Sequence, residues 1–343
     1  MTRRTDDAAL TLRPYGPRDE AAVLELLTAS LGGGPAGRRP AEFFRWKHLE
    51  NPFGRSFLLL AEDAGRVVGL RAFMRWRFES EGRVVTAARA VDTATDPEYQ
   101  GRGIFTRLTL AALDALRDEV DLIFNTPNEK SLPGYLKMGW EVLGTVPVWV
   151  GVRRPIRFAR GVGSIGEPNE VPPQIPVSAP AASEVLEDEE GVASLLRLPG
   201  RDGRLSTPRD GAYLRWRYGA APLLDYRAVR VSERGRLRGF AVFRVRTRGA
   251  LIEASVADAV AEPGDVVTTA KLLRAVARAS RVDHVAASFA SGTDAARAAR
   301  RAAFLRSRRG ATVVVHVLGA RSDGPDPRRL DSWNFTLGDL EVF

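Results

Sequence analysis

The 343-residue sequence repeats itself at a nearly constant spacing. Arg45-Trp46-Lys47 and Arg215-Trp216-Arg217 lie 170 residues apart. The same offset relates the pairs Pro52/Pro222, Gly65-Arg66/Gly235-Arg236, Gly69/Gly239 and Phe73/Phe243. It falls to 166 for Asp92/Asp258, Asp96/Glu262 and Pro97/Pro263, and to 162 for Asp121/Asp283. Offsets that hold through whole elements and drop in loops are typical of a duplicated domain. We therefore expect one fold that occurs twice.

A stretch rich in proline and glycine separates the two copies. We expect a first domain over residues 1–152, a linker over 153–182 and a second domain with a C-terminal tail over 183–343. A chain of this length suits two domains better than one. Hydrophobic residues make up 44% of the sequence, which is enough for each domain to bury a core.

Helix and strand patterns alternate along the first copy. Apolar residues at three- and four-residue spacing predict helices over residues 19–31 and 103–117, and shorter helices are expected over 41–49 and 128–138. Strands are expected over residues 10–13, 57–62, 67–77, 84–95, 120–125 and 140–150. This order indicates an α/β fold in which helices flank a twisted mixed sheet.

Composition excludes several kinds of site. The chain has no cysteine, which rules out disulfides, thiolate metal sites and cysteine nucleophiles. His48, His284 and His316 lie far apart, so we expect no metal site and no Ser-His-Asp triad. The net charge of +9 comes from a chain with four lysines and 47 arginines. These are spread along the sequence, so a nucleic-acid partner is not expected.

The sequence shows no pattern that would predict a secretory signal or a membrane span. No apolar stretch follows the first residues as a secretory signal requires, and the longest apolar runs have the length of strands. We expect a cytoplasmic protein with no membrane partner.

The segment from Thr95 to Phe105 has the features of an anion-binding loop. It follows a predicted strand, opens a predicted helix and contains Gly101 and Gly103. Small residues leave backbone N–H groups accessible at a helix N-terminus, where the helix dipole also favours a pyrophosphate. The segment lacks the Gly-Lys-Ser/Thr of a Walker loop and the glycine spacing of a dinucleotide fold.

Two blocks of sequence carry a family resemblance. Gln100-Gly101-Arg102-Gly103-Ile104-Phe105 is similar to the pyrophosphate loop of the GNAT (Gcn5-related) N-acetyltransferase superfamily, Arg/Gln-x-x-Gly-x-Gly/Ala, and departs from it only at Phe105. The second block, residues 128–140, resembles the pattern that follows it in that family. Its matching residues are Asn128, Ser131, Tyr135, Gly139 and Trp140. The resemblance covers about residues 10–152.

The resemblance implies a co-substrate and the residues that bind it. The co-substrate would be acetyl-CoA or another acyl-CoA, without a metal. A backbone N–H near the end of the fourth strand would polarise the thioester carbonyl. The implied binding residues are Thr93, Ala94, Thr95, Gln100, Gly101, Arg102, Gly103, Ile104, Phe105, Asn128 and Ser131.

The resemblance also implies catalytic roles. Tyr135 matches the family's general acid, and a phenol within reach can protonate a departing thiolate. Asp92 and Glu129 are candidates for the general base, acting directly or through water, and Asp92 is preferred. The repeat argues against this choice, because Asp258 holds the same place in the second copy and is more easily a structural acid.

The second copy has lost both blocks. At the loop position it reads Glu262 to Thr269, where Asp265 would repel a pyrophosphate, and no tyrosine follows Tyr226. We expect this copy to bind no CoA and to pack on the first domain. Asp339 in the tail is expected to reach an acceptor pocket. The alternating Arg71, Arg75 and Arg77 are expected on a solvated strand face, from which one of them meets an anion.

These expectations favour an N-acyltransferase (EC 2.3.1.-) acting on the amine of a small molecule, such as an amino sugar or an amino acid derivative. Two alternatives stay open. One is a non-catalytic acyl-CoA sensor or binding module, and the other is an aminoacyl-tRNA-dependent transferase of related fold. The sequence does not indicate the acceptor, the acyl chain length or the oligomeric state.

Overall fold

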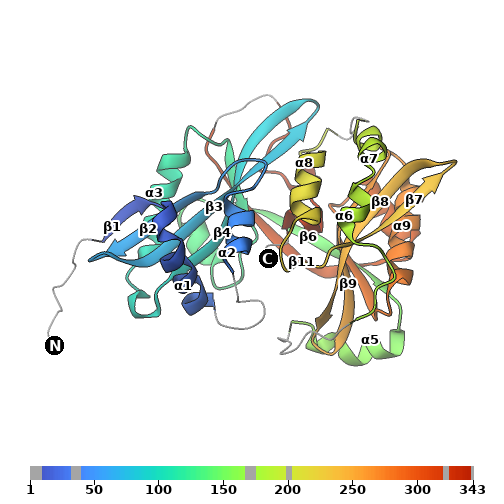
Figure 1. Ribbon diagram of the computed structural model, residues 1–343, viewed down its shortest axis with the longest axis horizontal. Coiled ribbons are helices and arrows are strands. Elements are labelled where there is room, and N and C mark those ends of the chain that lie inside the picture. Colours follow the sequence, from blue (N-terminus) through green and yellow to red (C-terminus); the bar gives the residue numbers. More distant parts are fainter. Residues whose placement is uncertain (1–9, 32–39, 167–174, 198–202, 320–323, 341–343) are drawn as a thin grey trace. The chain divides into compact units, whose positions relative to one another are not determined.

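The computed structural model describes residues 10–31, 40–166, 175–197, 203–319 and 324–340. The chain divides into two compact units, shown in Figure 1. The first comprises Met1–Trp76, Thr86–Trp140 and His316–Arg321. The second comprises Arg77–Val85, Glu141–Val315 and Ser322–Phe343.

A mixed five-stranded sheet forms the centre of the first unit, with strand order β1-β2-β3-β4-β5. β1 and β2 pair antiparallel, as do β2 and β3, whereas β4 and β5 pair parallel. The strands are β1 (Thr11–Pro14), β2 (Phe57–Asp63), β3 (Arg66–Ser80), β4 (Arg83–Thr95) and β5 (Leu122–Asn125).

Helices pack on this sheet where the sequence predicts them. They are α1 (Glu20–Leu31), α2 (Ala41–His48), α3 (Ile104–Leu116) and α4 (Leu132–Lys137). α3 approaches β3 closely at Gly69, where a Cβ atom would lie 2.7 Å from the Ile104 side chain and 3.1 Å from that of Leu108. α4 begins at Leu132 because Pro133 is tolerated only in the first turn of a helix. Glycine and proline therefore fix how these two helices meet the sheet.

The second unit contains a mixed sheet with strand order β11-β6-β10-β9-β8-β7. Its strands are β6 (Glu141–Val152), β7 (Arg227–Glu233), β8 (Arg236–Arg248), β9 (Leu251–Ala261), β10 (His284–Ser288) and β11 (Leu305–Val317). Its helices are α5 (Pro155–Gly161), α6 (Ala182–Leu186), α7 (Glu189–Leu196), α8 (Gly211–Leu214), α9 (Val266–Ala279), α10 (Asp294–Arg301) and α11 (Leu337–Leu340). α9 packs on β7, β8 and β9 over a core that includes Phe243, Leu272 and Val276.

The two units share details of their hydrogen bonding. The β2–β3 pairing shifts register after Ala61, and the β7–β8 pairing shifts after Val231, which is the position 170 residues later. The carboxylate of Asp121 accepts from the Thr86 backbone N–H at 2.8 Å, and that of Asp283 accepts from the Ile252 N–H at 2.8 Å. These matches follow the offsets of the sequence repeat.

The expected mixed α/β class is confirmed, and each element expected in the first copy has a counterpart in the structure. The division at residue 152 differs from the observed units, because β6 pairs with β10 and β11 of the second unit. The expected linker also differs. Its described part contains α5, and Ser178 donates its backbone N–H to Ala279. Residues 167–174 lie outside the described chain.

The close contact at Gly69 makes a prediction about stability. Gly69→Ala forces its methyl group against Ile104 and Leu108, and overpacking of this kind costs about 1–2 kcal/mol. Gly163→Ala is the matched control, since a Cβ atom there meets nothing within 4 Å and its φ is not positive. Denaturant unfolding should show a loss only for Gly69→Ala. Equal stability of the two variants would contradict the packing described for α3.

Candidate functional site

The loop that precedes α3 leaves a row of backbone N–H groups without protein partners. Gly101 and Gly103 have φ values of +77° and +73°, which glycine adopts without strain. Gly103 caps α3 with no side-chain hydrogen bond, and a Cβ atom on either glycine would meet nothing within 4 Å. Within the described part of the chain, none of the amides from Gln100 to Phe105 donates to a protein acceptor. Amides of this kind at a helix N-terminus suit an anion.

The corresponding helix of the second unit is capped by the protein itself. The Asp265 carboxylate accepts from the Thr268 N–H at 2.9 Å, and Asp294 accepts from the Gly264 N–H at 2.8 Å. The start of α9 therefore already carries negative charge and has fewer free donors. Of these two equivalent helix starts, only that of α3 has the features of an anion-binding loop.

β4 and β5 separate beside the α3 loop. Their parallel pairing joins Ala87–Arg89 with Leu122–Phe124, and β4 continues past these pairs to Thr95. Ala94 is buried, and the Thr95 carbonyl accepts from the Ser30 hydroxyl at 3.0 Å. The end of β4 thus leads directly from the sheet to the loop.

Tyr135 lies in α4 among aromatic side chains. It is 5% exposed, and its ring stands edge-on to Phe105 at 5.7 Å and to Trp140 at 5.1 Å. Phe105, the residue that departs from the family loop, therefore packs against α4. The Tyr135 hydroxyl accepts a hydrogen bond of 2.8 Å from Arg71.

Arg71 is fully buried, contrary to the expectation of a solvated strand face. Its guanidinium donates to Tyr135 and also to the Thr93 hydroxyl. It lies 4.6 Å from the ring centre of Phe73 and 5.4 Å from that of Phe105. Burial lowers the pKa of Arg71. This residue thereby connects β4, the α3 loop and α4, a role that strand alternation alone did not indicate.

Asp92 sits in a second buried cluster. Its carboxylate lies 2.7 Å from Lys47 Nζ and 2.9 Å from His48 Nε2, and the other nitrogen of His48 is 2.9 Å from the Ser56 hydroxyl. The side chains of Lys47, His48 and Asp92 are at most 4% exposed. A carboxylate already occupied by an ammonium and an imidazole has little capacity left to accept a substrate proton.

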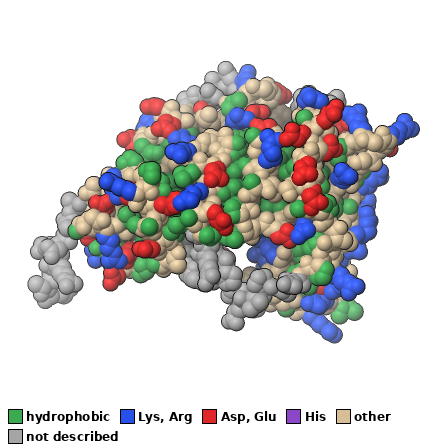
Figure 2. All heavy atoms as spheres, viewed as in Figure 1, with side chains coloured by type: hydrophobic (Ala, Val, Ile, Leu, Met, Phe, Trp, Pro, Cys, Tyr) green, Lys and Arg blue, Asp and Glu red, His purple; other side chains and the backbone are tan. Residues whose placement is uncertain are grey.

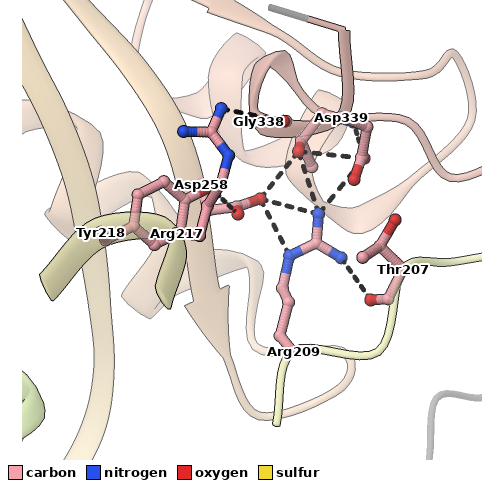
Figure 3. Close-up of polar contacts among 8 residues, drawn as sticks. Thr207, Arg209, Arg217, Tyr218, Asp258, Gly338 and Asp339 are labelled. Atoms are coloured by element: carbon pink, nitrogen blue, oxygen red, sulfur yellow. Dashed lines mark hydrogen bonds and ion pairs between the residues drawn. The ribbon is translucent and has the colours of Figure 1, made fainter. Parts of the chain in front are cut away.

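Figure 3 shows the equivalent cluster of the second unit. Asp258 is fully buried and lies 2.7 Å from the Arg209 guanidinium, which is also 3.3 Å from Asp339. Burial and the neighbouring Asp258 raise the pKa of Tyr218, so its phenol stays protonated and donates to Asp258. Tyr218 occupies the repeat position of His48. Asp339 takes part in this buried cluster, where its other partners include Thr336.

Asn128 and Ser131 contact each other at the start of α4. The Asn128 side chain accepts from the backbone N–H groups of Lys130 and Ser131 at 3.1 and 2.9 Å. These contacts shape the turn, and Glu129 within it is exposed. The structure thus brings Thr93, Phe105 and Tyr135 together around Arg71, whereas Asp92, Asn128 and Ser131 have other partners.

The surface carries charged side chains of both signs. On the face in Figure 2, acidic and basic side chains intermingle over much of the surface, and basic ones gather near the edge formed by α9. Residues 266–309 alone hold ten Lys or Arg and two Asp, so the basic charge is less evenly spread along the chain than predicted.

Among the residues that the structure describes, no group of three or more His, Asp or Glu side chains is placed to hold a metal. No described helix is long and apolar enough to cross a membrane.

A family comparison identifies the kind of domain that the first part of the chain resembles. The sequence profile of an acetyltransferase (GNAT) domain matches residues 11–143. This range contains β1 to β5, the α3 loop and Tyr135. No curated protein sequence is a significant match to the chain.

Similar solved structures cover most of the chain. A probable N-acyltransferase of unknown function from Enterococcus faecalis V583 aligns over 90% of this chain and 73% of its own, with 14% identity and a TM-score of 0.60. A GCN5-related N-acetyltransferase from Anabaena variabilis ATCC 29413 covers the same shares, with 17% identity and a TM-score of 0.59. Eis1 from Mycobacterium abscessus covers 90% and 74%, with 16% identity and a TM-score of 0.53. At these identities the likeness shows the fold alone.

The cluster at Asp92 makes a prediction that separates a structural from a catalytic role. Asp92→Asn removes the carboxylate charge that lies 2.7 Å from the buried Lys47 Nζ, which should lower the free energy of unfolding by about 3 kcal/mol. Adding Lys47→Met should restore most of that loss, because the buried ammonium is then removed together with the carboxylate charge. Urea unfolding measures both. If Asp92→Asn keeps full stability yet loses all turnover, Asp92 acts in catalysis and the structural interpretation is wrong.

Proposed function

Because residues 11–143 match the profile of a GNAT acetyltransferase domain, we propose that this protein transfers an acyl group from acyl-CoA to the amine of a small molecule in the cytoplasm. The acyl group is expected to be acetyl. An amino sugar or an amino acid derivative is the proposed class of acceptor. Acyl transfer in general is the chemistry of the family, and the roles of individual residues are part of the proposal.

The unpartnered amides from Gln100 to Phe105 carry this proposal. They fit a pyrophosphate, because they combine free N–H donors, open space above two glycines and the positive end of the α3 dipole. The separation of β4 from β5 next to this loop suits the extended arm of CoA, with the amides of Thr93 to Thr95 facing the thioester. When bound, acyl-CoA supplies an activated acyl group.

Tyr135 is proposed as the general acid. As the acceptor nitrogen bonds to the acyl carbon and the carbon–sulfur bond breaks, the sulfur leaves as a thiolate that needs a proton. Tyr135 has a hydroxyl close to the end of β4, since Arg71 contacts both Tyr135 and Thr93. Its largely buried ring excludes water from the proton transfer.

The acceptor nitrogen must also lose a proton. Asp92 stays a prediction for the base, but its burial and its ion pair with Lys47 favour a structural role. Glu129 is exposed on the turn before α4 and stays the alternative, directly or through water.

The second unit is proposed as a degenerate copy of the first domain. The shared register shift and the matched Asp121 and Asp283 contacts support duplication. Asp265 at the start of α9 argues against CoA binding there. The range 1–152 would then hold the chemistry, and the range 183–343 would be an inactive partner.

One observation favours a second candidate function. The basic segment over residues 266–309 suits a polyanion such as an aminoacyl-tRNA. Filter binding of tRNA over a salt series tests it. A steep loss of affinity with salt, together with acyl transfer from charged tRNA, would favour this candidate over acyl-CoA. A non-catalytic CoA sensor would bind acetyl-CoA and turn over no amine.

The role of Tyr135 can be tested directly. Tyr135→Phe removes the proton donor and keeps the ring packing against Phe105, so the turnover number should fall about 100-fold while acetyl-CoA affinity changes little. Release of free thiol from acetyl-CoA measures turnover, and the protein has no cysteine to interfere. Unchanged turnover would remove Tyr135 from the mechanism.

The loop assignment has a matched pair of variants. Gly103 and Gly65 both have positive φ and open space where a Cβ atom would lie, but only Gly103 stands at the start of α3. Gly103→Glu should abolish the thermal stabilisation that saturating acetyl-CoA gives, which is about 2.7 kcal/mol at 100 times the Kd. Gly65→Glu should retain it. If Gly103→Glu is stabilised by acetyl-CoA as strongly as the unsubstituted protein, the loop before α3 does not bind the pyrophosphate.

A further inference from the structure

Arg71 is a buried cation with no acidic partner. It is 0% exposed, and among the described residues no carboxylate contacts it. Its contacts are the hydroxyls of Tyr135 and Thr93 and the ring faces of Phe73, Phe105 and Tyr135. Its Nε atom is buried without a hydrogen-bond acceptor in the described chain. A buried charge is costly unless it is paired, so such an arginine is poorly explained by stability alone.

The hydrogen bond between Arg71 and Tyr135 has only one possible direction. A guanidinium has five N–H donors and no acceptor, so the phenol oxygen must accept. The hydroxyl proton of Tyr135 then points away from Arg71. Within the described residues, no protein acceptor takes that proton. It is therefore available to a ligand.

The second unit identifies which residues belong to the scaffold. Phe73 has an equivalent in Phe243, and Asp92 has one in Asp258. The three hydrogen-bonded residues have none, because Arg71, Thr93 and Tyr135 correspond to Ala241, Ala259 and Arg297. The fold of the second unit forms without them. We therefore infer that these three residues serve the chemistry of the first unit and not the shared fold.

We propose that Arg71 is a positioning residue for Tyr135, which holds the phenol oxygen as an acceptor and so directs its proton toward the leaving sulfur of acyl-CoA. The inference rests on the proposed acyl transfer. Phe105 belongs to the same arrangement, because it covers the guanidinium and packs edge-on against Tyr135. The large side chain of Phe105, where the family loop has Gly or Ala, then serves to cover the buried guanidinium of Arg71.

A double-mutant cycle tests this role. Arg71→Met removes the charge and keeps a side chain of similar length. It should lower the turnover number about tenfold, with the KM for acetyl-CoA changed less than about twofold. In a Tyr135→Phe background the same substitution should change turnover less than about twofold, because Arg71 acts through the lost hydroxyl. Arg71→Lys, which keeps a donor, should recover part of the activity. If the double variant loses turnover by the product of the two single losses, Arg71 and Tyr135 act independently and the proposal is wrong.

Arg75→Met is the control on the same strand face. Arg75 pairs with Glu119 and contacts neither Thr93 nor Tyr135, so its loss should leave turnover unchanged. A loss equal to that of Arg71→Met would mean that any change on this face disturbs the site, which would also overturn the proposal.

A binding cycle separates this inference from the proposed function. If the Tyr135 proton faces the sulfur, the protein should bind CoA more tightly than desulfo-CoA. Calorimetry should show that Arg71→Met and Tyr135→Phe each reduce this preference and that the double variant loses no more. If the unsubstituted protein binds CoA but acylates no amine, the proposed acyl transfer is refuted, and the role of Arg71 is still decided by the preference for CoA. A preference for CoA that survives Arg71→Met would refute the role of Arg71.

Discussion

The structure depends on how each unit neutralises the charges that it buries. The buried aspartate of β4 lies against Lys47 in the first unit, and that of β9 lies against Arg209 in the second. Each acid also contacts the side chain at one repeat position, His48 or Tyr218. Since unpaired buried charges destabilise a fold, these clusters tie helices, tail and sheet into fixed positions. Arg71 of the first unit departs from this pattern, because hydroxyls and aromatic rings surround it instead of a carboxylate.

The comparison between the units separates scaffold from chemistry. Register shifts, the buried acids and the contacts of Asp121 and Asp283 occur in both. Of the two equivalent long helices, only α3 begins with free amides, because Asp265 caps α9. We therefore propose that co-substrate binding depends on features that the second unit lacks. For the same reason Asp92, which has an equivalent, is a weaker catalytic candidate than Tyr135, which has none.

Local features of the sequence predicted much of the fold and of the loop. Periodicity located α1 and α3, and glycine spacing located the amides before α3. The burial of Arg71 could not be predicted, because strand alternation shows only that residues 71, 73 and 75 share a face and not what covers it. The sequence offered one signal. Phe73 is repeated as Phe243, whereas Arg71 two residues before it is replaced by Ala241, which sets Arg71 apart from the shared core. Likewise, nothing local to β6 indicates that its partners are β10 and β11.

We propose that only one of the two units binds the co-substrate. Calorimetric titration of the full chain with acetyl-CoA tests it most directly, because the stoichiometry counts sites independently of the acceptor. We predict one molecule of acetyl-CoA per chain. Two molecules per chain would show that the second unit also binds CoA, and no binding would remove the basis for acyl transfer from CoA.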